Sequence, residues 1–113
     1  MPRSLPVVKG TLDLLVLKAL TWAPMHGFEI RHWFDEHAPG ALAIEDSAIY
    51  QSLYRMEQRE LVVAEWGVTG EGRRARYYSI TPTGRSHLRA ETAHWTRYAG
   101  IVTGLLSLAN QQR

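Results

Sequence analysis

The stretch "EDSAIYQSLYRMEQRE" at residues 45–60 predicts an amphipathic helix that decides the fold. Ile49, Leu53 and Met56 recur at intervals of four and three residues, so they share one helix face, which we expect to be buried. The opposite face carries phenol and amide side chains with little acid, namely Tyr50, Gln51, Tyr54, Arg55 and Gln58. Such a face is unusual for a surface helix, and it is a candidate binding surface.

A second helix is predicted directly before it, in "MHGFEIRHWFDEHAPG" at residues 25–40. Its apolar side consists of Phe28, Ile30, Trp33, Phe34 and His37, and Pro39-Gly40 ends it. The run "ALAI" at 41–44 is long enough only for a brief strand or a connector, and Asp46 or Ser47 can cap the next helix. Two helices joined by so short a connection predict a helix-turn-helix, whose second helix meets base edges in the major groove of DNA.

A β-hairpin is predicted after these two helices. Its strands are "LVVAEWGV" at 61–68 and "RARYYSIT" at 74–81, both rich in β-branched and aromatic residues, with the turn "TGEG" between them. Arg73, Arg74 and Arg76 therefore lie at the tip and at the start of the returning strand. Alternation along that strand predicts that one ring of the Tyr77-Tyr78 pair enters the core.

Helices are also predicted at both ends of the chain. "GTLDLLVLKALTWAP" at 10–24 predicts a helix capped by Thr11, and Trp22 and Trp33 are expected in the core. A long final helix is predicted over 82–113, with Thr81 as its cap and Pro82 in its first turn. Two heptad series alternate along it with an offset of three residues. One consists of Leu88, Trp95, Val102 and Ala109, and the other of Glu91, Tyr98 and Leu105. They predict a partial coiled-coil seam.

Charge in this 113-residue chain is segregated rather than large in sum. Residues 29–46 hold five acids against one arginine, whereas residues 73–89 hold five arginines and no acid. Such separation favours a polyanionic partner, although the formal net charge is only +2. The chain has no cysteine, no long apolar run at its N-terminus and no window of about 18 apolar residues, so we expect a soluble, cytoplasmic, single-domain protein.

These elements together predict a winged helix-turn-helix, a mainly α fold with a small β-hairpin (α+β). Residues 1–81 would form the DNA-binding domain, with recognition helix 46–59 and wing 68–76, and residues 82–113 a dimerisation helix. Gln51 can pair with adenine through its amide, and Tyr50 can contact a thymine methyl or a phosphate, although Tyr50 and Tyr54 can equally pack against neighbours. The predicted DNA-binding residues are Lys9, His26, Ser47, Ala48, Tyr50, Gln51, Tyr54, Arg55, Gly72, Arg73, Arg74 and Arg76.

Several motifs, in the same order, resemble the PadR family of bacterial transcriptional regulators. They are "GTLDLLVLKAL" (10–20), "MHGFEI" (25–30), "AIYQSLYRMEQRELV" (48–62), "EWG" (65–67), "GRRARYYSIT" (72–81) and "TGR" (83–85). The length is similar to the short class with a single C-terminal helix, and the opening motifs are similar to a branch found beside genes for ABC-transporter-type permeases. The resemblance implies a homodimer joined by its C-terminal helices that binds an inverted repeat, usually as a repressor.

Three positions depart from the family pattern. Ser47-Ala48 stands where the family usually has a glycine followed by threonine or serine, so one hydroxyl for a phosphate has moved or gone. Gln51 replaces a common proline and offers a base-reading amide. Glu60 replaces a glycine that usually ends the recognition helix, so a left-handed cap would be strained there and we expect the end to be built differently.

Other functions have weaker support in the sequence. His87, Glu91 and His94 share a helix face, but surface histidines are ordinary, and we expect no metal or cofactor. No glycine-framed nucleophile or phosphate loop is present, so we expect no enzyme activity. A winged helix that binds a protein partner through its aromatic third helix is the alternative to DNA binding, and His26 can contact a phosphate or merely cap its helix.

The final helix carries the predicted dimer interface. Its residues are Leu88, Trp95, Tyr98, Val102, Leu105 and Leu106. Trp95 and Tyr98 either pack between protomers or, in the sharper hypothesis, line a cavity for a flat hydrophobic or aromatic effector.

Overall fold

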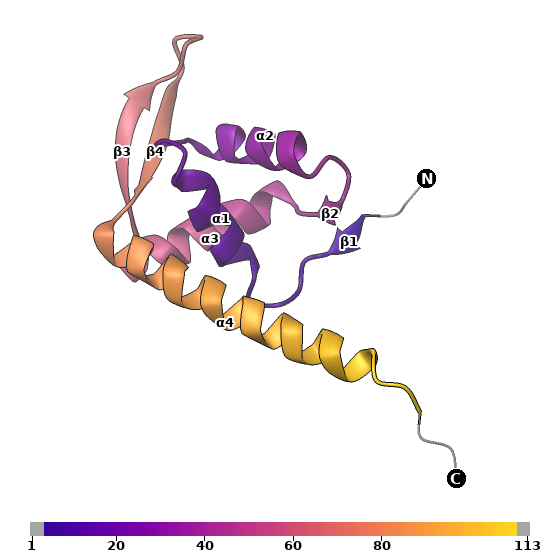
Figure 1. Ribbon diagram of the computed structural model, residues 1–113. Coiled ribbons are helices and arrows are strands. Elements are labelled where there is room, and N and C mark those ends of the chain that lie inside the picture. The colour runs from indigo at the N-terminus through magenta and orange to yellow at the C-terminus, as the bar shows by residue number, and fades with distance from the viewer. Residues whose placement is uncertain (1–3, 111–113) are drawn as a thin grey trace.

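The computed structural model describes residues 4–110 (Figure 1). In chain order they form β1 (Leu5–Pro6), α1 (Leu12–Leu20), α2 (Gly27–His37), β2 (Leu42–Ala43), α3 (Asp46–Gln58), β3 (Val62–Val68), β4 (Arg74–Ile80) and α4 (Pro82–Leu106). Helices α1, α2 and α3 pack together, the β3–β4 hairpin projects from one end of this cluster, and α4 runs along it toward the C-terminus. The predicted mainly helical fold with a small hairpin is confirmed.

The core lies where α1, α2, α3 and the base of the hairpin meet. Its buried apolar residues are Val16, Leu17, Ala19, Leu20, Ile30, Phe34, Ile44, Ile49, Leu53, Met56, Leu61, Val62 and Tyr78. The predicted inward face of α3 is thus confirmed, and each large side chain contributes about 1.5–3 kcal/mol through burial. Three predictions are wrong, because Trp22, Phe28 and His37 are all exposed. Trp33 is only partly buried, and the edge of its ring meets Trp22 at a centroid distance of 5.2 Å.

Helix α1 begins without the predicted side-chain cap. Thr11 has helical backbone angles, and its hydroxyl donates to the carbonyl of Val8 at 2.7 Å instead of accepting from the helix. Helix α3 also begins differently from prediction. Its N-cap residue is Glu45, in extended backbone and without a side-chain cap bond, so neither Asp46 nor Ser47 has that role.

The end of α3 contradicts the expectation of a different ending at Glu60. Glu60 takes a left-handed φ of 59°, and its N–H donates to the Glu57 carbonyl at 3.0 Å. The N–H of Leu61 reaches the Met56 carbonyl at 2.9 Å, which completes the usual two-bond helix ending. A glutamate therefore occupies the place of a glycine, at a conformational cost of about 1–2 kcal/mol.

A short parallel pair joins the N-terminal segment to the connection between α2 and α3. Leu5 pairs with Leu42 and Pro6 with Ala43, and the Ser4 hydroxyl donates to the Gly40 carbonyl at 2.8 Å. The brief strand expected within residues 41–44 is confirmed, whereas β1 was not predicted. The pair ties the start of the chain to the turn of the helix-turn-helix.

The hairpin is antiparallel over its full length. Val62 pairs with Ile80 at its base and Val68 with Arg74 near its tip. Met25 extends the base through two hydrogen bonds with Tyr78, of 2.8 and 3.0 Å. Tyr78 is buried and Tyr77 lies on the other face against Gly67, so the prediction of one core ring in this pair is confirmed.

Helix α4 begins as predicted and ends earlier. The Thr81 hydroxyl accepts from the Gly84 N–H at 2.9 Å, and Pro82 occupies the first turn. The helix ends at Leu106, so Ala109 lies beyond it, and residues 111–113 lie outside the described part of the chain. None of the helices in residues 4–110 is long and apolar enough to span a membrane.

Candidate nucleic-acid interface

The exposed face of α3 carries the aromatic and amide side chains that were predicted there from the sequence. Tyr50 and Tyr54 are 51% and 65% exposed, and Gln51 is exposed beside them. Neither tyrosine is packed into the core, so burial does not explain the aromatic side chain at Tyr54. Ser47 is exposed and Ala48 half-buried near the start of the same helix.

Tyr50 is held in place by the first residue of α2. Its ring and hydroxyl lie directly against Gly27, where even a methyl group would overlap the phenol. Gly27 is buried, so the absence of a side chain there is what allows Tyr50 to cross between the two helices. This contact could not be predicted, because Gly27 and Tyr50 lie 23 positions apart.

His26 caps α2 with its own ring. The Glu29 N–H donates to His26 Nδ1 at 3.3 Å, and the His26 N–H donates to Glu29 Oε1 at 3.1 Å. This reciprocal pair satisfies two backbone groups that a helix start leaves free. The ring also lies 5.2 Å from that of Tyr77, centroid to centroid. Of the two roles considered for His26, capping is therefore present in the structure.

An acidic side chain of α1 anchors α3 through hydrogen bonds. Asp13 Oδ1 accepts hydrogen bonds from the Ser52 hydroxyl at 2.6 Å and from Arg55 Nη2 at 2.7 Å. Ser52 is fully buried, whereas the Arg55 side chain remains about half exposed. Arg55, predicted to contact DNA, is thus also an internal tie between α3 and α1.

The wing tip is a closed turn with defined backbone bonds. The Thr69 N–H donates to the Arg73 carbonyl at 2.7 Å, and the Gly72 N–H donates to the Thr69 carbonyl at 2.9 Å. Gly72 has a φ of +81°, a conformation that glycine adopts without strain. This turn places Arg73 at the end of the hairpin.

The three wing arginines have different surroundings. Arg76 forms an ion pair with Glu57 of α3, with Nη2 to Oε2 at 2.9 Å and Nη1 to Oε1 at 3.3 Å. The hydrogen bond to Glu57 raises the pKa of Arg76 above its ordinary value, so the guanidinium stays charged. Arg74 lies over the indole of Trp66, with its Cζ 4.3 Å from the ring centroid. Within residues 4–110, neither Arg73 nor Arg74 forms an ion pair of 4.0 Å or less.

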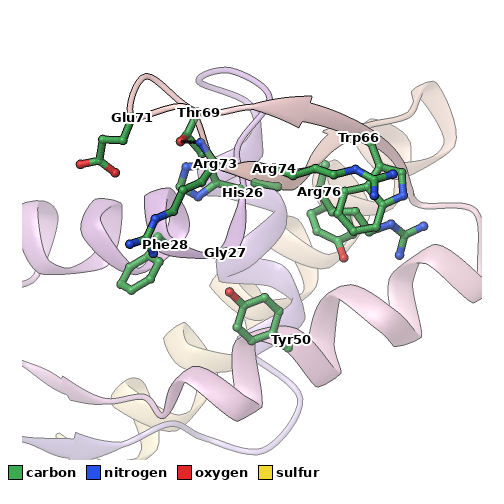
Figure 2. Close-up of a pocket in the computed structure, with 12 residues that line it drawn as sticks. His26, Gly27, Phe28, Tyr50, Trp66, Thr69, Glu71, Arg73, Arg74 and Arg76 are labelled. Atoms are coloured by element: carbon green, nitrogen blue, oxygen red, sulfur yellow. Dashed lines mark hydrogen bonds between the residues drawn. The ribbon is translucent and has the colours of Figure 1, made fainter.

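A cleft of about 420 Å³ separates the wing from α2 and α3 (Figure 2). Its walls are formed by His26, Gly27, Phe28, Tyr50, Trp66, Thr69, Glu71, Arg73, Arg74, Ala75, Arg76 and Tyr78. Figure 2 shows Tyr50 rising from α3 on one side and the wing arginines lying across from it. The cleft thus brings together predicted contacts from the helix and from the wing, although these segments are separate in the sequence. Gln51, Tyr54 and Lys9 do not line it.

Among the cleft residues that sequence reasoning missed, Trp66 and Phe28 have the largest exposed side chains. Phe28 was assigned to the core, and Trp66 was noted only as part of a motif. The signal for Trp66 was available, because counting in steps of two from the turn puts it on the same hairpin face as Arg74 and Arg76.

An apolar surface on α4 remains uncovered in the single chain. Tyr98, Ile101, Leu105 and Leu106 are exposed, Trp95 is 40% exposed, and Val102 is half-buried. Leu88 differs, because it packs partly against the core of its own chain. Ile101 was not among the predicted interface residues. Trp95 also borders a hollow of about 250 Å³ lined by Leu5, Pro6, Val7, Val8, Thr11, Leu14, Leu15 and Leu42. The part of the chain that the structure describes holds no group of three or more metal-ligating side chains.

Comparison with known proteins agrees with this geometry. Residues 16–90 match the Transcriptional regulator PadR-like family, which covers well over half of the chain. A helix-turn-helix with a β-wing defines a class of DNA-binding regulators, and within that class the chain belongs to the PadR-like family. It is therefore a transcriptional regulator that binds DNA, and not an enzyme.

Solved structures of similar proteins share the fold. A PadR family transcriptional regulator from Eggerthella lenta is 30% identical, with a TM-score of 0.77 over 89% of this chain and 86% of that one. A putative transcriptional regulator from Thermoplasma acidophilum is 31% identical, with a TM-score of 0.71 over 89% and 95% of the two chains. A PadR-like transcriptional regulator from Bacillus cereus is 24% identical, with a TM-score of 0.76 over 89% and 96%, and supports the fold alone.

Proposed function

We propose that this PadR-like regulator is a cytoplasmic homodimeric repressor that binds an inverted-repeat operator with two recognition helices and two wings. The observation that carries the proposal is the cleft in which Tyr50 of α3 and the basic wing face each other. A duplex whose major groove holds α3 would present its adjacent minor groove or flanking phosphates to the wing.

Each predicted contact has a role in this proposal. Gln51 reads a base edge, and Tyr50 and Tyr54 contact bases or phosphates. Arg73 and Arg74 bind the backbone or the minor groove at the wing. The remaining proposed contacts, nearer the backbone, are Lys9, His26, Ser47, Ala48, Arg55, Gly72 and Arg76.

Residues 1–81 form the proposed DNA-binding domain and residues 82–113 the dimerisation segment. The uncovered apolar side chains of α4 support this division, because a lone helix gains nothing by exposing Ile101, Leu105 and Leu106 to water. The same side chains buried against a second copy would form the core of a dimer interface. The single C-terminal helix supports the short PadR class, and the motifs at 10–20 and 25–30 support the branch associated with ABC-transporter-type permease genes.

A small flat hydrophobic effector, bound beside Trp95, would release the operator. The hollow next to Trp95 supports this part of the proposal, because its lining is mostly apolar and it meets both the N-terminal segment and α1. Planar hydrophobic compounds would quench tryptophan fluorescence in the parent and not in Trp95→Ala, which must remain dimeric. A broad panel without any response would exclude the effector while leaving DNA binding untouched.

The DNA-binding proposal is tested by affinity at several salt concentrations. Arg73→Ala combined with Arg74→Ala should weaken binding to operator and random duplex alike, because phosphate contacts carry little sequence information. Gln51→Ala should weaken binding to the operator by about 1–3 kcal/mol and weaken binding to random duplex far less. If the double arginine variant binds random duplex as tightly as the parent at about 0.15 M salt, the wing assignment is wrong. An affinity for a protein partner that does not change with salt concentration would favour the alternative, a protein-interaction module.

A further inference from the structure

Trp66 is a large aromatic residue on the wing that adds little to the core. It lies on β3, is 58% exposed, and stands opposite Arg76 in the hairpin register. Val68 stands opposite Arg74, so Trp66, Arg74 and Arg76 share one hairpin face. This face lines the cleft that also contains Tyr50 (Figure 2).

The indole of Trp66 determines where the Arg74 guanidinium lies. The guanidinium carbon is 4.3 Å from the ring centroid, well within the range of a cation–π contact. Arg76, two residues further on, is instead held by the Glu57 carboxylate at 2.9 Å. An aromatic ring orders an arginine without neutralising its charge, whereas a carboxylate orders it and cancels the charge. Trp66 therefore leaves Arg74 fixed in direction and still able to bind an anion.

We propose that Trp66 is a positioning residue for DNA binding, which holds Arg74 toward the sugar-phosphate strand that passes between α3 and the wing. This inference rests on the proposed function, in which α3 occupies a major groove and the wing the neighbouring minor groove. The strand separating those two grooves must then pass the cleft. Arg74 binds a phosphate of this strand, and because its side chain is already ordered on the indole it loses less conformational freedom on binding.

The experiment compares the parent with Trp66→Ala, Trp66→Phe, Trp66→Leu, Arg74→Ala and the double variant Trp66→Ala/Arg74→Ala. Affinity for a random-sequence duplex of about three helical turns is measured across a salt series. Arg74→Ala should weaken binding about tenfold and lower the salt slope by about one per protomer. Trp66→Ala should weaken binding about three- to fivefold and lower the slope in part. The double variant should bind within about twofold of Arg74→Ala, because removal of Arg74 leaves Trp66 nothing to position.

The phenylalanine and leucine variants separate positioning from a structural role. Phenylalanine keeps a ring face for Arg74 and should bind within about twofold of the parent, whereas leucine should behave like alanine. Thermal unfolding of each variant controls for loss of the fold. The inference is overturned if Trp66→Ala binds like the parent, if its loss adds in full to that of Arg74→Ala, or if leucine serves as well as phenylalanine.

Failure of the proposed function would look different. A parent protein without salt-dependent affinity for any duplex would overturn DNA binding at this cleft and the role of Trp66 with it. Weakening by Arg73→Ala together with an unchanged Trp66→Ala variant would leave the proposed function standing and overturn the role of Trp66 alone.

Discussion

The phenol of Tyr50 lies directly against Gly27, so that α2 and the exposed side of α3 touch where no side chain separates them. A methyl group at residue 27 would overlap the ring of Tyr50 and force it out of the cleft. The contact with the buried Gly27 holds the half-exposed side chain of Tyr50 in position. It therefore links helix packing to the position of a proposed DNA contact.

Gly27→Ala should destabilise the fold and weaken DNA binding together. We expect a loss of about 1–3 kcal/mol in the free energy of unfolding, the usual cost of forcing atoms into a filled space. Denaturant unfolding and operator affinity measure the two effects. For the loss of stability, Gly70→Ala is the matched control, because a methyl group there meets nothing within 4 Å. Unchanged operator affinity in Gly27→Ala would show that Tyr50 does not depend on this contact.

Glu60→Gly should stabilise the protein. The residue has a φ of 59°, which costs a non-glycine side chain about 1–2 kcal/mol. Glycine removes this strain but gains more freedom in the unfolded chain, so the net increase in unfolding free energy should be roughly 0.5–1 kcal/mol. Glu60→Ala, which keeps the strain, should show no such gain. A higher denaturation midpoint for alanine than for glycine would contradict the strained cap.

Asp13→Ala should destabilise the protein mainly by leaving a buried hydroxyl without its partner. Ser52 is fully buried and its Oγ lies 2.6 Å from the Asp13 carboxylate, so we expect a loss of about 1–3 kcal/mol. Asp13→Ala combined with Ser52→Ala should lose less than the two single changes added together. Additive losses in denaturant unfolding would mean that the pair does not act as a unit.

Leu105→Glu should disrupt the proposed dimer without unfolding the single chain. The side chain is 65% exposed on α4, so a charge there is tolerated in the protomer and unpaired when buried in an interface. Sedimentation or light scattering measures the oligomeric state, and far-ultraviolet circular dichroism checks the helix content. Gln58→Glu is an exposed control on another helix. A dimer that survives the change at Leu105 would place the interface elsewhere.

Periodicity was a sufficient guide to the main elements. The inward face of α3, the two long strands and the start of α4 were all predictable, because each follows a regular spacing of apolar residues or a local cap. Local reasoning failed at the start of α1 and at the end of α3. Thr11 does not cap α1, and Glu60 takes a backbone conformation that its own side chain disfavours.

Part of the candidate site was predictable as separate residues, but its arrangement was not. The exposed face of α3 and the arginine-rich tip followed from spacing and composition. The contacts that organise them join residues far apart in the chain, as in Asp13 with Arg55 and Gly27 with Tyr50. The exposure of Phe28 and Trp22 could not be inferred either, since large apolar residues are normally assigned to the core.

The single hydroxyl of Thr81 joins the segment that follows α3 to the first turn of α4. It donates to the carbonyls of Glu60 and Leu61 at 2.8 and 3.0 Å, and it accepts from the N–H of Gly84 at 2.9 Å. The end of α3 and the start of α4 are therefore tied together through one side chain. In the proposed dimer this connection would fix the distance and the relative orientation of the two recognition helices. Each base pair inserted between the half-sites rotates one half-site relative to the other by about 34°. We therefore expect the dimer to bind such an operator through one half-site only.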